Sequence, residues 1–270
     1  MDDQKVVLIT GASSGVGQST ARLLSQSGYR VFGTSRNPEV AKAIPDVQMF
    51  ALDVRSDASV SACVTALAKQ AGRIDVLVNN AAYELAGALE ETSLEETKAQ
   101  FETNFFGVVR MVQAVLPSMR RQKEGRIINV SSLSGVSSIP FMGIYSASKF
   151  ALEGYTEALR MELKPFNIHV SLTEAGFLKT PMMDKRQVSA LRLKEYDAWR
   201  QRAFTAIRQQ EEKSPGPELV AETLLRIISS PAPRLHYLIG GQARFVAGVK
   251  WFLPAGTYER AKMGNFGLGK

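Results

Sequence analysis

Short β-branched apolar runs alternate with helical stretches along this chain, and that alternation restricts the fold more than any other feature. Runs that predict strands lie at residues 5–10, 29–34, 47–52, 74–78, 126–130, 168–173 and 235–239. Strands separated by helices predict βαβ units, whose right-handed crossovers place helices on both faces of a parallel sheet. The pattern therefore predicts an α/β fold with one doubly wound sheet of about seven parallel strands. Its ligand is expected at the carboxyl ends of the strands.

The composition of the 270 residues excludes several classes of protein. A single cysteine, Cys63, excludes a disulfide framework, and the presence of only two histidines, His169 and His236, argues against a metal site. No apolar run reaches the roughly 18 residues of a membrane span. The acidic start, residues 1–5, leads directly into a strand and does not resemble a secretory signal. We therefore expect a cytoplasmic protein without a metal.

The net charge of +7 comes from the last third of the chain. Residues 185–270 hold 15 Lys and Arg against 7 Asp and Glu, a local net charge of +8. Such an excess suits nucleic acid, an anionic membrane surface or ligand, or a solvated helical face. The solvated face is favoured, and no nucleic-acid partner is expected because aromatic and basic residues are not interleaved there. Peripheral contact with a membrane is an alternative that no other sequence feature supports.

A glycine-rich turn joins the first strand to the first helix, where a dinucleotide site requires one. Glycine adopts the backbone angles of a tight turn, and a helix N-terminus offers free N–H groups and partial positive charge to a pyrophosphate. A plain tight turn is the alternative. The turn predicts a Rossmann-type site that contacts the cofactor through Gly11, Ser13, Ser14, Gly15, Val16 and Gly17.

The ends of the following strands indicate which cofactor binds. An NAD site carries an acid near the end of the second strand, whereas this chain has Ser35 and then Arg36. A guanidinium suits a 2′-phosphate, so the sequence favours NADP(H), with NAD(H) as the alternative. Further cofactor contacts are expected after the third and fourth strands, from Asp53, Val54, Asn80 and Ala81.

Tyr145 and Lys149 are spaced i and i+4, so a helix would place them on one face. A nearby ammonium stabilises a phenolate, which makes a tyrosine a usable general acid or base. The same spacing recurs at residues 258–262, but only Tyr145 is preceded by a serine at a strand end, Ser132, and by Asn104. We therefore interpret residues 258–262 as a repeat of the spacing without catalytic function.

Residues 5–240 resemble the short-chain dehydrogenase/reductase family. The motifs Thr-Gly-x-x-x-Gly-x-Gly, Asn-Asn-Ala, Ser and Tyr-x-x-x-Lys occur in the order typical of that family. The resemblance implies that hydride passes between the nicotinamide and a carbonyl or alcohol, while Tyr145 exchanges the proton and Ser132 orients the oxygen. It implies that Lys149 holds the nicotinamide ribose and lowers the Tyr145 pKa, and that Asn104 holds a water. These four residues are the predicted catalytic set.

Two positions depart from the family pattern. Ala175 stands where the family usually has proline, and Ala82 stands where it usually has glycine. The resemblance nevertheless implies nicotinamide contacts after the sixth strand, from Gly176, Leu178 and Thr180, together with Tyr145 and Lys149.

The resemblance also places a substrate lid at about residues 181–215. The charged stretch 185–213 predicts a helix, and an ordinary core-facing stripe is an alternative to a substrate contact. Apolar residues near one stripe of this stretch are Val188, Leu191, Trp199, Phe204 and Ile207. We expect a bulky apolar substrate to contact Trp199, Phe204, Phe141 and Met142.

The predicted domain organisation is a catalytic domain over residues 1–240 and an extension over residues 241–270 that packs near the substrate pocket. Residues 245–270 weakly resemble the extension of steroid- and retinol-type members of the family. Packing against its own domain and contact with a membrane surface are the alternatives.

The predicted function is NADP-dependent oxidoreduction of a hydrophobic ketone, aldehyde or secondary alcohol. A non-catalytic NADP(H)-binding redox sensor and an NAD-dependent alcohol dehydrogenase are the alternatives. The family further implies a homodimer or homotetramer that assembles through the helices at about 95–122 and 145–163.

Overall fold

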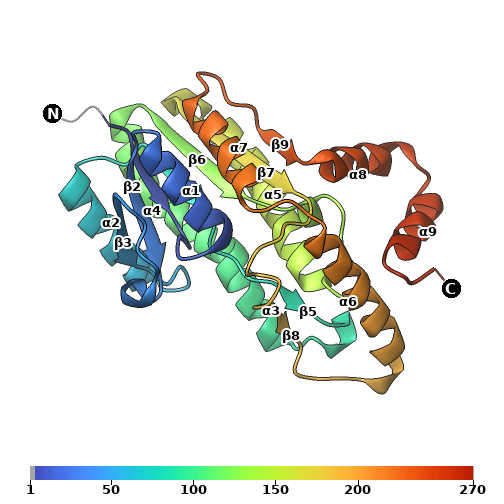
Figure 1. The fold of residues 1–270 in the computed structure, drawn as a ribbon. Helices are drawn as coiled ribbons and strands as arrows, with labels where there is room; N and C mark the ends of the chain where they lie inside the picture. The colour runs from blue at the N-terminus through green and yellow to red at the C-terminus, as the bar shows by residue number, and fades with distance from the viewer. Residues whose placement is uncertain (1–3, 270) are drawn as a thin grey trace.

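The centre of the protein is a seven-stranded parallel sheet, seen in a computed structural model that describes residues 4–269 (Figure 1). The strands are β1 (Val6–Ile9), β2 (Arg30–Ser35), β3 (Val47–Ala51), β4 (Val76–Asn79), β6 (Gly125–Val130), β7 (Ile168–Ala175) and β9 (His236–Ile239). They lie in the order β3-β2-β1-β4-β6-β7-β9, and every neighbouring pair is parallel. This confirms the predicted doubly wound Rossmann-type sheet. The strand order reverses between β1 and β4, where such folds bind their ligands.

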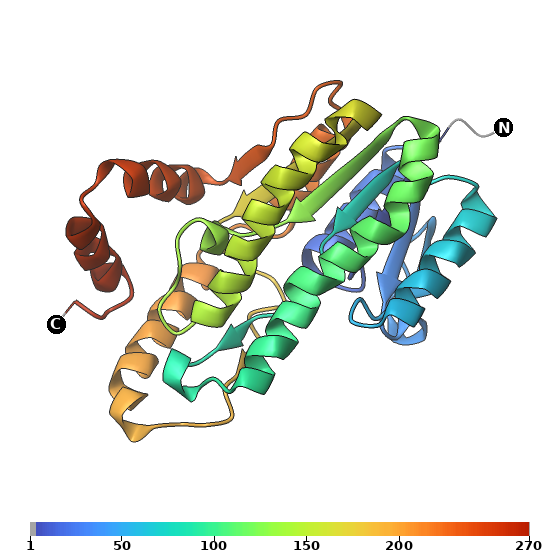
Figure 2. The same ribbon diagram turned by 180° about the vertical axis from the view of Figure 1, so that it is seen from behind.

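Helices cover both faces of the sheet (Figures 1 and 2). One face is covered by α1 (Gly15–Gln26) and α7 (Glu218–Ser229), and the other by α2 (Asp57–Ala71), α4 (Gly107–Gln122) and α5 (Gly143–Leu163). The remaining elements are α3 (Leu94–Phe101), β5 (Leu85–Ala86), β8 (Gln187–Val188), α6 (Asp197–Glu212), α8 (Gly241–Phe252) and α9 (Ala255–Asn265). Of these, α3, β5, β8 and α6 lie beyond the carboxyl ends of the central strands, and α8 and α9 follow β9.

The two helical layers exist because alternate strand residues point to opposite faces of the sheet. Leu8 and Leu77 belong to the core beneath α2, α4 and α5, whereas Val7, Ile9 and Val76 belong to the core beneath α1 and α7. All five side chains are fully buried. Since both faces are covered, the central strands are continuous apolar runs, which is why the sequence pattern located them.

The structure corrects two helix predictions. The helix expected over 95–122 is interrupted by a π-helical turn at Glu102–Phe106, which separates α3 from α4. The helix expected from residue 185 begins only at Asp197, because the preceding chain pairs with β5 as strand β8. Val188 is therefore part of a strand and does not share a helical stripe with Ile207.

The described residues give no membrane-spanning element. Within residues 4–269 every helix is too short or too polar to cross a bilayer. Residues 1–3 of the acidic start, and Lys270 of the C-terminal extension, lie outside the described residues.

Candidate active site

The turn after β1 has the geometry of a phosphate cradle. Gly11 and Gly15 have φ angles of +68° and +55°, which residues with a side chain disfavour. A Cβ at Gly17 would overlap the Gly11 carbonyl oxygen, so the turn packs this closely on α1 only with glycine there. Ser14 caps α1 without a side-chain hydrogen bond, and the first turn of α1 holds no acidic residue. The helix N-terminus is thus available to an anion.

Thr10 and Asn80 fix this turn against the end of β4. The Thr10 hydroxyl accepts hydrogen bonds from the backbone N–H groups of Asn80 and Ala81 at 2.9 and 3.0 Å. The Asn80 amide donates to the carbonyl oxygens of Thr10 and Gly11 at 2.9 and 3.1 Å. The predicted contacts Asn80 and Ala81 therefore also brace the cradle, and both line the cavity described below.

Two arginines line the cavity just after the ends of β2 and β3. Arg36 is exposed at the cavity edge and forms no ion pair or hydrogen bond within the described residues. Arg55 instead donates to the Asp53 carboxylate at 2.7 Å through Nη2, and this hydrogen bond holds the Asp53 pKa at about 2. The sequence analysis missed Arg55, although an acid and an arginine two residues apart after a strand are a usable signal.

Three of the four predicted catalytic side chains line one cavity: Ser132, Tyr145 and Lys149. The Ser132 hydroxyl, just after β6, is hydrogen-bonded to the Tyr145 phenol and accepts from the Ser134 backbone N–H at 3.1 Å. Lys149, one turn further along α5, donates from Nζ to the Val130 carbonyl oxygen at 2.8 Å, and Nζ lies 5.9 Å from the centre of the Tyr145 ring. A phenol and a hydroxyl thus converge beside a buried ammonium.

Burial has the largest effect on the pKa values of Tyr145 and Lys149. It raises the pKa of Tyr145 above its usual 10, Glu84 raises it further, and the Ser132 hydrogen bond opposes the rise. Burial also lowers the pKa of Lys149 to about 8, while Glu153 and Glu84 oppose that shift. The neutral phenol, which is the proton-donating form, is therefore favoured. The lowering of the Tyr145 pKa by Lys149 that the resemblance implies stays a prediction.

Asn104 is buried in the π-helical turn and does not line the cavity. Its Nδ2 donates to the Tyr83 carbonyl oxygen at 3.1 Å and to the Ser148 hydroxyl at 3.2 Å, and its Oδ1 accepts from the Tyr83 backbone N–H at 3.1 Å. The side chain therefore ties the loop after β4 to α5. π-Turns inside α-helices are frequent at functional sites, and a helical pattern alone does not reveal one.

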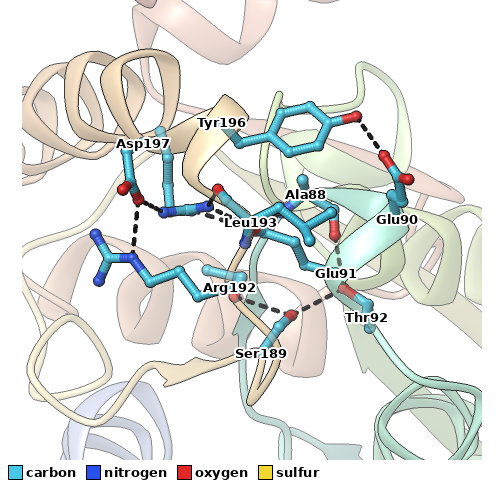
Figure 3. Close-up of polar contacts among 11 residues, drawn as sticks. Ala88, Glu90, Glu91, Thr92, Ser189, Arg192, Leu193, Tyr196 and Asp197 are labelled. Atoms are coloured by element: carbon cyan, nitrogen blue, oxygen red, sulfur yellow. Dashed lines mark hydrogen bonds and ion pairs between the residues drawn. The ribbon is translucent and has the colours of Figure 1, made fainter.

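Residues 181–215, which are predicted to form a substrate lid, are attached to residues 84–92, and Figure 3 shows the part of this contact between residues 88–92 and 189–197. Backbone N–H groups of Gln187 and Ser189 donate to the carbonyl oxygens of Glu84 and Ala86, both at 2.9 Å. At the far end of this contact, Arg200 of α6 forms an ion pair with Glu91. These contacts hold the segment at the cavity, which it lines with Met182, Met183, Lys185 and Gln187.

The structure separates the four predicted substrate contacts. Met142 lines the cavity. Phe141 and Phe204 pack edge to face with ring centres 6.4 Å apart, in the apolar cluster that contains Tyr145, but neither lines the cavity. Trp199 is 41% exposed and does not line the cavity, so its contact with a substrate stays a prediction. The inward positions of α6 are Arg200, Ala203, Ile207 and Glu211.

The C-terminal extension reaches the substrate side of the site. Phe266 and Leu268 are buried in the same apolar cluster as Tyr145. Tyr258 and Lys262, the second Tyr-x-x-x-Lys spacing, both hydrogen-bond the Ser137 hydroxyl, in the loop that follows Ser132. In this structure Tyr258 and Lys262 therefore attach the C-terminal extension to the loop that follows Ser132.

These elements surround a cavity of about 520 Å³ at the carboxyl ends of the strands. Every predicted cofactor contact lines it except Gly17, which packs beneath the turn. The residues fit a nicotinamide dinucleotide: a glycine cradle, an open helix N-terminus, the exposed Arg36 guanidinium, and a buried ammonium beside Tyr145. Ala175, in place of the usual proline, is the last residue of β7 and pairs with Ile239.

Comparison with known proteins decides the family. The sequence model described as "short chain dehydrogenase" matches residues 5–190. The chain belongs to the short-chain dehydrogenase family. It is 41% identical over 261 residues to a 3-ketodihydrosphingosine reductase from Bacteroides thetaiotaomicron, covering 95% of this chain and 96% of that one. It is 36% identical over 276 residues to retinol dehydrogenase 8 from Bos taurus, covering 95% and 88%. A short-chain dehydrogenase structure from Streptomyces avermitilis superposes with a TM-score of 0.83 at 30% identity, covering 98% and 97%.

Similar solved structures contain nicotinamide cofactors of both kinds. An actinorhodin polyketide ketoreductase holds NADPH; its TM-score is 0.78 at 30% identity, covering 90% of this chain and 98% of that one. A protein from Burkholderia phymatum holds NAD; its TM-score is 0.77 at 28% identity, covering 93% and 94%. This dehydrogenase is thus an oxidoreductase of a family that uses nicotinamide cofactors.

Behind the catalytic residues of the dehydrogenase lies a buried acidic pair. Glu153, one turn beyond Lys149 on α5, is hydrogen-bonded to Glu174 of β7, whose Oε1 lies 2.7 Å from Nδ1 of His236. Burial, reinforced by Glu174, raises the pKa of Glu153 to about 8. The pair therefore holds a proton at neutral pH. The sequence analysis assigned no contacts to His236, because its partners are distant in the chain.

We expect Glu153→Gln to remove a pH dependence of stability. The unfolded glutamate releases its proton near the ordinary pKa of 4.5, whereas the folded one keeps it up to about 8. Between these values the wild type loses up to about 1.4 kcal/mol of unfolding free energy per pH unit through this group, and the neutral glutamine does not. Urea unfolding at pH 5, 6, 7 and 8 should therefore favour the variant increasingly. The exposed Glu162→Gln on the same helix is the control, and parallel curves for wild type and Glu153→Gln would refute the assignment.

Proposed function

We propose that this dehydrogenase is an NADP(H)-dependent oxidoreductase that interconverts a hydrophobic carbonyl compound and its secondary or primary alcohol. The observation that carries the proposal is the pairing of the Tyr145 phenol with the Ser132 hydroxyl in the same cavity as the glycine cradle. When bound, the cofactor supplies a hydride to the carbonyl carbon in reduction and accepts one in oxidation.

The chain's own residues act on the carbonyl oxygen. In reduction Tyr145 donates its phenolic proton to that oxygen as the carbon gains hydride, so the product is the neutral alcohol. Ser132 donates a hydrogen bond to the same oxygen and fixes its position between the two hydroxyl groups. Lys149 holds positive charge beside the phenol and lines the same cavity, where it would bind the ribose hydroxyls of the nicotinamide half. In oxidation the proton returns to the Tyr145 phenolate.

The substrate half of the cavity favours an apolar compound. Ile139, Met142, Phe177, Met182 and Met183 all line it. Thioether and aromatic side chains adapt to long or bulky apolar groups. The names of two relatives suggest the first compounds to test, namely 3-ketodihydrosphingosine and a retinoid alcohol or aldehyde.

The preference for NADP(H) rests on Arg36. We expect Arg36→Ala to raise the Kd for NADPH by about 10- to 100-fold, since a hydrogen bond to a charged group contributes about 1.5–3 kcal/mol. The Kd for NADH should change by less than about two-fold, because NADH has no 2′-phosphate for the guanidinium to bind. Fluorescence titration of both cofactors measures these constants.

Arg22→Ala is the matched control for this titration, because Arg22 is exposed on α1 and does not line the cavity. It should leave both constants unchanged. A wild type that prefers NADH, or an Arg36→Ala variant that still prefers NADPH, would contradict the cofactor assignment.

We also propose that the dehydrogenase assembles as a homodimer or homotetramer through α4 and α5. Phe106, immediately before α4, and Phe150 of α5 expose 45% and 41% of their surfaces. Large apolar side chains at such positions favour contact with another copy.

A further inference from the structure

The proposed reduction leaves Tyr145 as a phenolate after each turnover, and a proton must reach it before the next one. Tyr145 and Lys149 are both buried, so this proton has to pass through other groups. Asn104, where the resemblance places a water, makes its side-chain hydrogen bonds to Tyr83 and Ser148. A second set of polar groups leads from Lys149 to the surface, and the proposed mechanism does not use it.

This second set consists of Glu153, Glu174 and His236, which we call the acid–histidine cluster. One polar atom of each side chain lies within 4.8 Å of the other two. Nδ1 of His236 lies 2.7 Å from Glu174 Oε1 and 3.9 Å from Glu153 Oε2. The side chains of Glu153 and Glu174 are 10% and 3% exposed, whereas that of His236 is 44% exposed. The cluster therefore has a buried end and an end in contact with solvent.

The buried end of the cluster faces Lys149. Glu153 follows Lys149 by four positions on α5, so the two side chains lie on one face of the helix. Burial lowers the pKa of Lys149 and raises that of Glu153, and each of the two groups opposes the shift of the other. Glu84 also acts on the Lys149 pKa, but it is ion-paired with Arg186. Glu153 is therefore the carboxyl that can exchange a proton with Lys149.

Ser131 lies between the cluster and the cavity. It lines the cavity together with Lys149, and it also acts on Glu153, whose pKa it lowers. Its hydroxyl oxygen is buried without a hydrogen-bond partner among the described residues. Lys149 Nζ donates to the Val130 carbonyl oxygen, next to Ser131, and forms no ion pair with Glu153 within residues 4–269. Buried hydroxyl groups of this kind bind ordered water, which would connect Lys149 to Glu153.

The groups along this path have similar proton affinities. Burial, reinforced by Glu174, raises the pKa of Glu153 to about 8, and burial lowers the pKa of Lys149 to about 8. Burial also raises the pKa of Glu174, and the hydrogen bond to His236 opposes that rise. The free-energy cost of a proton transfer grows with the difference between two pKa values, so transfer between Glu153 and Lys149 costs little. The other groups that act on the two carboxyls are Ser131, Glu157 and the backbone N–H of Tyr237.

We propose that the acid–histidine cluster relays the proton that restores Tyr145 after each reduction. A proton enters from solvent at His236, passes through Glu174 and Glu153, and reaches Lys149, which gives a proton to the Tyr145 phenolate. One proton enters for each one that the product alcohol takes away, so the relay returns to its starting state. In oxidation the proton leaves by the same path. The three residues do not touch the substrate and act through Lys149, and the inference rests on the proposed carbonyl reduction.

The test separates the first turnover from those that follow. The protein is mixed rapidly with excess NADPH and with 3-ketodihydrosphingosine or dodecan-3-one, and NADPH oxidation is recorded. The first turnover uses the proton already on Tyr145, so Glu153→Gln should leave its rate within about two-fold of the wild type. Later turnovers need the relay, so the steady-state rate should fall at least about ten-fold, after a burst of one NADPH per active site. Glutamine keeps the shape of the protonated carboxyl, so the variant should fold, and Glu162→Gln on the same helix is the control.

His236→Ala tests the solvent end of the cluster. Its steady-state rate should also fall, and added imidazole should restore it, because a free imidazole can carry the proton to Glu174. Imidazole should not restore Glu153→Gln, in which the block lies deeper. His169→Ala is the matched control, because His169 lies on the same sheet but does not contact the cluster within the described residues. It should respond neither to the substitution nor to imidazole.

Three outcomes would overturn the inference. An unchanged steady-state rate in Glu153→Gln shows that the proton arrives by another path, and leaves the proposed carbonyl reduction standing. A first turnover slowed as much as the steady state shows that the cluster only shapes the site, and likewise leaves that reduction standing. Absence of wild-type turnover with both ketones, despite NADPH binding, overturns the inference and the proposed function together.

Discussion

Replacing Tyr145 by phenylalanine is expected to lower kcat by about 10²- to 10⁴-fold, which is the usual contribution of a positioned general acid. The variant removes only the hydroxyl that donates the proton, while the ring stays packed between Met142 and the residues of α6. NADPH binding should persist, because the cradle and Arg36 lie at the other end of the cavity. Steady-state turnover and NADPH titration of the same preparation separate the two effects.

Tyr155→Phe is the matched control for this substitution. Tyr155 lies on the same helix, contacts Phe105 edge to face and does not line the cavity. It should leave kcat within about two-fold of the wild type. Undiminished turnover in Tyr145→Phe would exclude the tyrosine as proton donor and would remove the proposed mechanism.

Replacing Arg200 by methionine is expected to lower the free energy of unfolding by about 3–5 kcal/mol, the usual cost of leaving one partner of a buried ion pair uncompensated. The side chains of Arg200 and Glu91 are 3% and 1% exposed, and they join the predicted lid to the segment before α3. Glu91 also accepts the backbone N–H groups of Leu193 and Ala88 at 2.8 and 3.0 Å. Urea unfolding measures the loss.

Two further variants show whether the loss comes from the unpaired charge. The double variant Arg200→Met with Glu91→Gln should recover part of the stability, because no buried charge then lacks a partner. Arg192→Met removes an arginine that is 66% exposed and paired with Asp197, and it should have little effect. A loss below about 1 kcal/mol in Arg200→Met would show that the lid does not depend on this pair.

Features that depend on residues close together in the chain could be predicted from the sequence. The strands were found because both faces of the sheet are covered, which makes runs such as Val6–Ile9 continuously apolar. The residues of the glycine turn, and Tyr145 with Lys149, lie close together in the chain, so their spacing was informative. Their placement around one cavity follows from the meeting of strand ends in a parallel sheet.

The remaining features depend on contacts between distant segments. Glu91 and Arg200 are 109 positions apart, and neither is surrounded by a motif that marks it as buried. Trp199 was assigned to the substrate because it is aromatic, but it precedes the inward residue Arg200 by one position, about 100° around α6. The ion pairs of Arg186 with Glu84 and Glu211 join three separate segments, and charged residues of this kind are typical of a surface until the fold brings them together.

The most direct test of the central claim is hydride transfer itself. The dehydrogenase would be mixed with excess 3-ketodihydrosphingosine, or with a long-chain ketone, and NADPH carrying deuterium at the transferable position of C4. Mass spectrometry of the product should find one deuterium on the carbinol carbon for each NADPH oxidised, and none in Tyr145→Phe over the same interval. NADPH that binds in the cavity but transfers no deuterium to any of these ketones would contradict the assignment of this chain as a carbonyl reductase.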